Sequence, residues 1–273
     1  MLKWRLISFP LLVGILCFIF LAPYKYGYPV FAVAAVIAIP LAVFECARML
    51  DKCGIGTMPI SCGIFTAVLT AAFMFQRRLG FLFPILFVLL ITLPWILVLV
   101  RREFAVEKVF GSVGTIVLVS IPYLALAAHF GSEKLNRLFF IILATKAMDT
   151  GGYIFGMLSG KLLPGGNHKL CPNVSPKKSW EGAIGGLILS LAVGWAFFAL
   201  RNDMPLAKYL VFAAILAVAS IFGDLTESAL KRRCGVKDSG NWIPGMGGVL
   251  DVLDSFIYTA VACALFAFVA AFF

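Results

Sequence analysis

Residues 223–255 read GDLTESALKRRCGVKDSGNWIPGMGGVLDVLDS, in which two acidic clusters are joined by a basic, glycine-rich segment. Each cluster borders a long apolar run, so we expect each to stand at the end of a helix. If the first cluster is helical, Asp224 shares one face with the polar residues at i+3, i+4 and i+7, which are Glu227, Ser228 and Lys231. This face would place acidic and basic groups side by side.

The second acidic cluster repeats the spacing with Asp251, Asp254 and Ser255, which we place on the next helix. Carboxylates beside lysines, arginines and backbone N–H groups suit a Mg²⁺-nucleotide, because the metal takes carboxylate and phosphate oxygens while the cations neutralise the remaining phosphate charge. We therefore interpret Asp224 and Asp251 as metal ligands and Asp254 as a third candidate. The alternative is that these charges only mark the membrane boundary, although acids at membrane depth need partners.

The composition indicates a membrane protein. Hydrophobic residues make up 62% of the 273 residues, and the mean hydropathy is +1.02. Soluble domains are closer to half apolar. We predict an all-α, polytopic integral membrane protein. Its net charge of +10 is better explained by membrane orientation and an anionic substrate than by a nucleic-acid partner, because the basic residues fall between apolar runs.

Runs of about 20 apolar residues are long enough to span a bilayer. They predict about nine transmembrane helices: 6–23, 28–46, 58–76, 80–100, 109–130, 137–157, 182–200, 208–230 and 251–273. The first apolar run has no small-residue cleavage site after it, so we expect a retained helix. Lysines and arginines favour the N-terminus and the even-numbered loops by roughly two to one, which predicts a cytoplasmic N-terminus and cytoplasmic polar loops.

The N-terminal part, residues 1–136, is predicted to be a scaffold of transmembrane helices. Its acids lie at helix ends or in loops, where we expect water to solvate them: Glu45, Asp51, Glu103 and Glu107. Residues 137–273 are predicted to form the catalytic region of the same continuous membrane domain. The seven cysteines show no metal-ligand spacing and no disulfide framework, so we expect free thiols.

The predicted sixth helix contains Lys146 and Asp149, three residues apart in an apolar stretch. A mutually satisfied ion pair and a functional role both remain open for them. Gly151 and Gly152 follow, and they would let a helix or a ligand approach closely.

The next loop reads NVSPKKSWEG over residues 173–182. It offers two ammonium groups and hydroxyl donors just before a helix, whose N-terminal amides and dipole would hold a phosphate. Trp180 suits the interfacial belt better than base stacking.

These segments resemble the CDP-diacylglycerol synthases (phosphatidate cytidylyltransferases). The C-terminal motif of that family is matched by Ser228, Lys231-Arg232, Lys237-Asp238-Ser239-Gly240, Pro244-Gly245, Gly247-Gly248, Asp251 and Asp254. Its second hallmark is matched by residues 175–182, with Ser179 in place of Thr, and a third segment by Asp149, Tyr153 and Gly156. Three positions depart: Met246 stands where the family usually has His, and Val252 and Met157 stand where it often has Arg.

The resemblance implies a multi-pass enzyme of the cell (inner) membrane, facing the cytoplasm, that converts CTP and phosphatidate to CDP-diacylglycerol and pyrophosphate with Mg²⁺. It also suggests a homodimer. The expected catalytic residues are Asp224, Asp251, Lys231 and Ser228. The expected substrate-binding residues are Ser175, Lys177, Lys178, Arg232, Lys237, Asp238, Asp149 and Tyr153. Two alternatives stay open: a CTP-dependent lipid-alcohol kinase of related architecture, and an ion-coupled membrane transporter.

Overall fold

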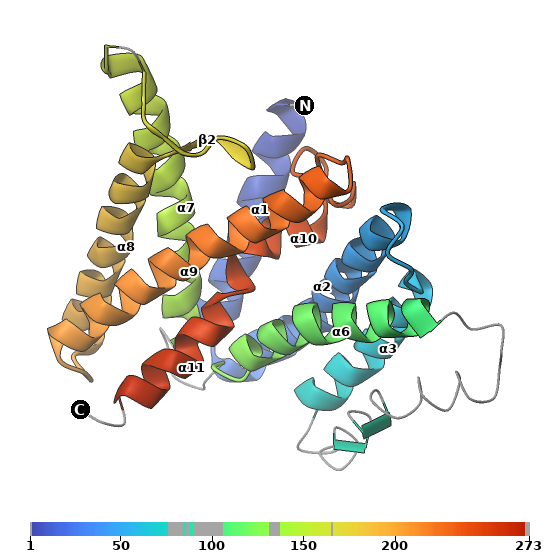
Figure 1. Ribbon diagram of the computed structural model, residues 1–273. Coiled ribbons are helices and arrows are strands. Elements are labelled where there is room, and N and C mark those ends of the chain that lie inside the picture. The colour runs from blue at the N-terminus through green and yellow to red at the C-terminus, as the bar shows by residue number, and fades with distance from the viewer. Residues whose placement is uncertain are drawn as a thin grey trace. The chain divides into compact units, whose positions relative to one another are not determined.

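The computed structural model describes residues 2–75, 84–85, 88–89, 106–130, 137–164 and 166–270 (Figure 1). The chain divides into two compact units, each assembled from two stretches of sequence. The first unit comprises residues 1–127 and 233–253, and the second comprises residues 128–232 and 254–273. The division predicted from the sequence, between scaffold residues 1–136 and catalytic residues 137–273, is based on function and not on compactness. It stays a prediction.

The first unit is built around α2 (Tyr24–Lys52). The other helices of this unit are α1 (Leu2–Leu21), α3 (Pro59–Met74), α6 (Val106–Ala127) and the short α10 (Val249–Leu253). All four pack against α2. The hydroxyl of Tyr123 on α6 donates to the carbonyl of Leu253, 3.1 Å away, and so ties the end of α10 to the helical core.

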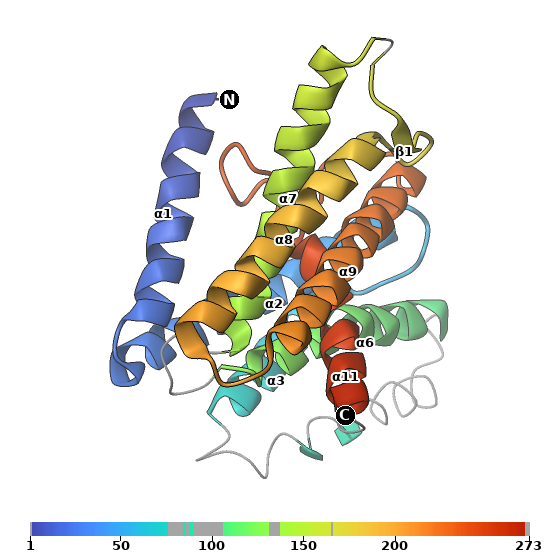
Figure 2. The same cartoon turned by 90° about the vertical axis from the view of Figure 1, so that its left-hand side faces the viewer.

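The second unit contains three long helices that lie close together in both ribbon views (Figures 1 and 2). They are α7 (Arg137–Leu162), α8 (Trp180–Arg201) and α9 (Leu206–Arg233). The unit also holds the strands β1 (Lys169–Cys171) and β2 (Ser175–Ser179), the 3₁₀ turn η1 (Asp254–Phe256) and α11 (Thr259–Ala270). Phe140 of α7 packs its ring against Phe197 and Phe212 from the neighbouring helices.

Glycines allow α7 and α8 to cross at backbone contact. A Cβ added to Gly151 would lie 2.7 Å from Cα of Gly186, and one added to Gly182 would lie 2.6 Å from the carbonyl oxygen of Gly152. No side chain larger than hydrogen fits at such distances, which is how small residues serve helix packing in membranes. The predicted close approach at Gly151 and Gly152 is therefore an approach of helices.

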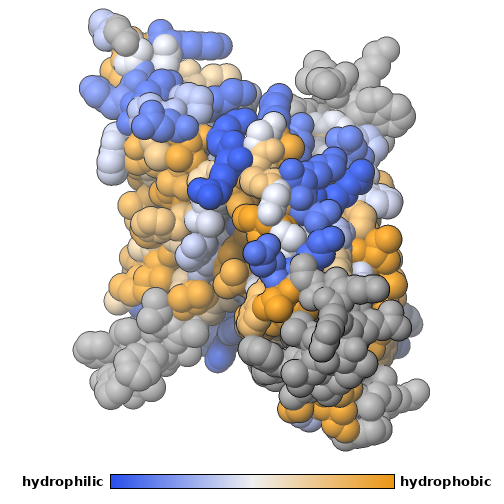
Figure 3. Space-filling view, turned by 45° about the vertical axis from the view of Figure 1, so that its right-hand side comes forward, coloured by the Kyte–Doolittle hydropathy of each residue, from blue (hydrophilic) through white to orange (hydrophobic). Residues whose placement is uncertain are grey.

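Five described helices are long and apolar enough to cross a membrane: α2, α6, α7, α8 and α9. Shorter apolar helices cover Pro10–Leu21 and Pro59–Met74, while the predicted helix 80–100 falls mostly outside the described residues. Hydrophobic residues cover broad areas of the face in Figure 3. Leu118 of α6 and Ile188 of α8 are examples of large exposed apolar side chains. Such surfaces suit contact with lipid.

Two local predictions were wrong. The segment 251–273 is not one helix, because its first part is divided between α10 and η1. The side chain of Asp254 accepts a hydrogen bond from the N–H of Ser255, 2.6 Å away, and this local bond competes with the helical pattern. The second error concerns the loop before α8, which contains the antiparallel pair β1–β2.

Candidate functional site

The first acidic cluster lies on the last turns of α9, as its spacing predicts. Glu227 is buried, with 2% of its surface exposed, and it forms an ion pair with Lys231 one turn later. The helical prediction for this face is confirmed. Ser228 on the next position is half-buried, and Arg232 is exposed.

A second ion pair links this helix to the strand before α8. Nζ of Lys178 lies 2.9 Å from Oδ2 of Asp224, and each side chain is 24% exposed. Lys178 is held there because β2 pairs with β1 and then ends at Ser179, whose hydroxyl accepts the N–H of Gly182 and caps α8. The structure therefore joins two signature segments that lie 46 residues apart in the chain.

A third polar group extends the cluster toward α7. Nζ of Lys146 lies 2.9 Å from Oδ2 of Asp149 and donates to the hydroxyl of Ser255 at 2.8 Å. The hydroxyl of Ser220 on α9 donates to Oδ1 of Asp149 at 2.7 Å. The sequence analysis missed Ser220, whose only signal was its place one turn before Asp224. Asp149 therefore has a lysine and a hydroxyl as partners inside the second unit.

Asp254 completes this cluster, because Gly223 lets η1 approach α9 at backbone distance. A Cβ on Gly223 would lie 2.5 Å from the carbonyl oxygen of Asp254. The Asp254 carboxylate is close enough to Asp224 and Glu227 to be repelled by both. We name six of these acidic and basic groups the α9 cluster: Lys146, Asp149, Lys178, Asp224, Glu227 and Asp254.

An oxygen of Asp224 in the α9 cluster is suited to a metal ion. Oδ1 of Asp224 is buried and has no hydrogen-bond partner among the described residues. Carboxylate oxygens are the ligands that Mg²⁺ prefers, and this ion usually takes only one or two of them together with substrate phosphates and water. Within the described ranges, no group of three or more His, Cys, Asp or Glu side chains could hold a metal by itself. Asp224 fits a metal that a substrate helps to bind.

The second acidic cluster is divided between the two units. Asp251 belongs to the first unit and Asp254 to the second, so the pairing of Asp224 with Asp251 around one metal stays a prediction. Oδ2 of Asp251 accepts three hydrogen bonds, from the N–H of Gly248 at 2.7 Å and from the N–H and the hydroxyl of Ser239 at 2.9 Å each. The bond to Gly248 caps α10 from its first turn. Asp251 therefore already shapes the glycine-rich segment.

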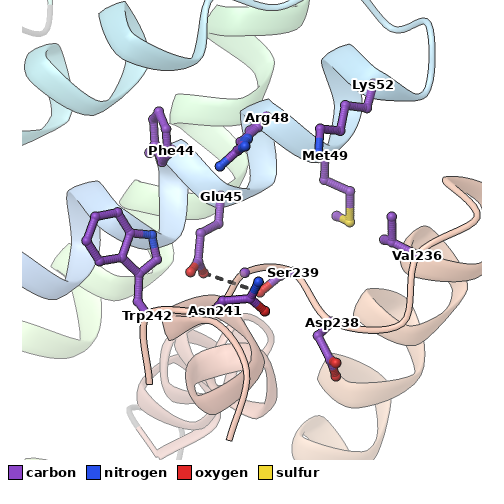
Figure 4. Close-up of a pocket in the computed structure, with 11 residues that line it drawn as sticks. Phe44, Glu45, Arg48, Met49, Lys52, Val236, Asp238, Ser239, Asn241 and Trp242 are labelled. Atoms are coloured by element: carbon purple, nitrogen blue, oxygen red, sulfur yellow. Dashed lines mark hydrogen bonds between the residues drawn. The ribbon is translucent and has the colours of Figure 1, made fainter. Parts of the chain in front are cut away.

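Glu45 contradicts its prediction as a solvated acid at a helix end. The helix continues for two turns beyond it, to Lys52, and only 2% of its surface is exposed. Its carboxylate accepts hydrogen bonds from the segment that carries Asp251 (Figure 4). The signal available in the sequence was its position inside the apolar run 28–46, where an acid requires a partner.

A cavity of about 320 Å³ opens beside this segment. One wall comes from α2 and the other from the residues that lead to α10 (Figure 4). The lining combines aromatic, basic and amide side chains: Phe44, Glu45, Arg48, Met49, Lys52, Val236, Asp238, Ser239, Gly240, Asn241 and Trp242. Its volume lies at the lower end of the range for small-molecule sites.

The remaining predicted site residues are exposed to different degrees. Tyr153 leaves 70% of its surface exposed. Lys177 on β2 is also exposed, whereas Ser175 is half-buried. In the first unit, Lys237 and Asp238 are exposed, and Asp238 lines the cavity.

Fold and site together define a class: a helical protein with several membrane-length apolar helices, in which carboxylates are held beside lysines. The model of the cytidylyltransferase family matches residues 3–270. Because the match covers nearly the whole chain, the protein belongs to this family.

The curated relatives carry a more specific name. Over 146 residues the chain is 42% identical to a phosphatidate cytidylyltransferase of Staphylococcus saprophyticus subsp. saprophyticus, and the match covers 52% of this chain and 54% of the relative. The protein of that name from Haemophilus influenzae is 40% identical over 135 residues, which is 46% of this chain and 45% of the relative. The chain thus spans about half the length of the curated relatives it matches.

Proposed function

We propose that this chain transfers a cytidylyl group from CTP to phosphatidate, forming CDP-diacylglycerol and pyrophosphate. An ionised oxygen of the phosphatidate phosphate forms a bond to the α-phosphorus of CTP. The bond from that phosphorus to the oxygen that bridges to the β-phosphate breaks, and pyrophosphate leaves with its electron pair. The names of the relatives support this substrate pair.

The observation that carries the proposal is the contact between Lys178 and Asp224. It brings the basic segment before α8 to the acidic end of α9, so cations for phosphate and carboxylates for a metal stand in one cluster. A transferase of phosphate esters needs this combination, because its catalysis rests mainly on positioning and on neutralising charge.

The residues of the proposed site then have roles that their chemistry permits. Lys178 and the exposed Lys177 bind phosphate oxygens, and Arg232 extends the basic surface at the end of α9. Lys231 is held in place by Glu227, and Ser228 and Ser175 donate hydrogen bonds. Asp224, with Asp251 and Asp254 as further candidates, would hold Mg²⁺. When bound, this ion would neutralise phosphate charge and lower the barrier to attack at phosphorus.

The segment before α10 and the cavity beside it serve the same reaction. Asp238 lines this cavity, and Lys237, Asp149 and Tyr153 stay in the proposal as expected substrate-binding residues. The charge asymmetry of the loops supports a cytoplasmic face for this site and an inner-membrane location, so that CTP arrives from the cytoplasm and phosphatidate arrives from the bilayer. A homodimer is part of the proposal on the resemblance alone.

One assay tests the proposal. Purified protein in lipid nanodiscs is given Mg²⁺, CTP labelled on the cytidine and, in separate reactions, phosphatidate or a lipid alcohol, and the products are separated. We expect labelled CDP-diacylglycerol and one pyrophosphate for each. Release of CDP with a newly phosphorylated lipid alcohol would identify a kinase instead. Absence of any nucleotide product with either lipid would remove the enzymatic proposal and favour a transporter.

A further inference from the structure

The carboxylate of Glu45 anchors the part of the C-terminal motif that leads into α10. Oε1 accepts the N–H of Val249 at 3.1 Å, and Oε2 accepts the N–H of Leu250 at 2.8 Å. Oε2 also lies 3.2 Å from the hydroxyl of Ser239 (Figure 4). Between 194 and 205 residues separate Glu45 from these partners along the chain. A buried carboxyl group that loses a hydrogen-bond partner costs the full desolvation of that group, so these bonds hold the segment in place.

Two glycines of the C-terminal motif, Gly240 and Gly248, lie directly against this carboxylate. A Cβ added to Gly240 would lie 2.1 Å from Oε1 of Glu45, and one added to Gly248 would lie 2.5 Å from Oε2. At either distance the Glu45 carboxylate or the glycine backbone would have to move to admit a side chain. The contact with Glu45 therefore explains why glycine stands at both positions, although Glu45 itself lies outside the C-terminal motif.

Ser239 connects Glu45 to Asp251. Its hydroxyl lies 3.2 Å from Oε2 of Glu45 and 2.9 Å from Oδ2 of Asp251. A hydroxyl has one proton, so it donates to one of the two carboxylates at a time. The N–H of Ser239 donates to Asp251 as well. A change at Glu45 must therefore move the segment that holds the Asp251 carboxylate.

We propose that Glu45 is a positioning residue for Asp251. It fixes the start of α10 and the Ser239 turn, and so sets where the Asp251 carboxylate points in the cytidylyl transfer. This inference rests on the proposed function for its catalytic part, while the anchoring of the segment can be measured without activity.

The test compares Glu45→Gln with Glu45→Asp and with the control Glu107→Gln, which changes an exposed acid of the same unit. Glutamine has the same shape, but its NH₂ group must face one of the backbone N–H donors. We expect at least about a tenfold lower kcat per folded protein for Glu45→Gln, with the KM values for CTP and phosphatidate within about twofold of wild type. Glu45→Asp should recover part of kcat, and the control should keep it.

Hydrogen exchange of residues 239–251, followed by mass spectrometry, reports the anchor directly. The amides in this stretch should exchange at least about tenfold faster in Glu45→Gln than in wild type, because one of their two carboxylate acceptors is lost. An unchanged exchange rate, or an unchanged kcat with faster exchange, would overturn the positioning role. If wild type makes no CDP-lipid while Glu45→Gln still accelerates exchange, the proposed function fails and the anchor is supported.

If Glu45→Gln does not fold, Ser239→Ala provides a second test, because it keeps the buried Glu45 carboxylate intact. This change removes only the hydroxyl between Glu45 and Asp251, so the protein should fold. We expect kcat to fall by at least about threefold, again without a matching rise in KM. A Ser239→Ala enzyme with wild-type kcat would contradict the proposed connection of Glu45 to Asp251 through Ser239.

Discussion

Replacing Lys178 by methionine removes the cation from Asp224 and keeps most of the apolar stem. Two unit charges at about 4 Å attract each other by about 4 kcal/mol at an effective dielectric constant near 20. The observed Nζ–Oδ2 distance is 2.9 Å, and each side chain is 24% exposed, so the pair is largely but not fully shielded from water. Because methionine leaves a carboxylate without its cation, we expect a loss of about 2–3 kcal/mol in the free energy of unfolding.

A double-mutant cycle isolates the pair. The variants are Lys178→Met, Asp224→Asn and the double variant, and unfolding is followed by a denaturing detergent titration. The coupling energy should be about 1–3 kcal/mol, the range for residues in direct contact. Lys177→Met is the matched control, because Lys177 is an exposed neighbour on the same strand, and it should change stability by less than about 0.5 kcal/mol.

The same variants test the proposed metal ligand without an activity assay. Removing Lys178 removes the group that competes with a cation for Asp224, so Mg²⁺ should stabilise Lys178→Met more than it stabilises wild type. Asp224→Asn should lose the stabilisation and lower turnover by at least about a hundredfold. Additive single mutations, together with equal Mg²⁺ effects in every variant, would refute both the energetic pair and the metal assignment.

Four further results are expected. Asp251→Asn should fold, because an amide oxygen can still accept from the α10 turn, but turnover should fall at least about a hundredfold; near-normal turnover at ordinary Mg²⁺ would remove Asp251 from the metal site. An impermeant thiol reagent should label Cys171 in inverted vesicles and not in intact cells, and the reverse would overturn the orientation. Burial and the neighbouring Cys53 thiol raise the pKa of the Cys234 thiol to about 11, so Cys234 should label slowly at neutral pH and faster as the pH rises; fast labelling at pH 7 would contradict its burial. Arg48→Ala should raise the KM for CTP several-fold and leave the KM for phosphatidate unchanged, whereas the opposite pattern would assign the cavity to lipid.

The α9 face was predictable because helical spacing is a local property. Asp224, Glu227 and Lys231 fall on one side of any helix through them, so the ion pair between Glu227 and Lys231 follows from the chain itself. The contact between Lys178 and Asp224 was harder to predict from the sequence, because it depends on a β-hairpin whose two strands comprise eight residues. Short strands of this kind carry little periodic signal.

The break after α10 was not predictable from local pattern, and the burial of Glu45 had only one signal, its position inside an apolar run. Hydropathy treats residues 251–273 as one apolar run, whereas the bond between the Asp254 side chain and the next N–H acts on a single turn. Glu45 stands near the end of an apolar run, where a solvated acid is the ordinary case. Only its partners, about 200 residues further along the chain, reveal that the helix continues and the acid is buried.

The positions that depart from the family pattern change the charge of the site more than they change its chemistry. Met246 stands where a histidine is usual, but it lies in the turn from Ile243 to Gly247, which backbone hydrogen bonds hold closed. The attacking group in the proposed reaction is a phosphate oxygen that is already ionised at neutral pH, so no side chain has to remove a proton from it. What the site must supply is alignment and cations, and these are the roles proposed for Glu45 and Lys178. The rate should therefore show no essential ionisation near pH ~6.5, the unperturbed value of histidine, and a steep loss of rate through that pH would show that a base is needed after all.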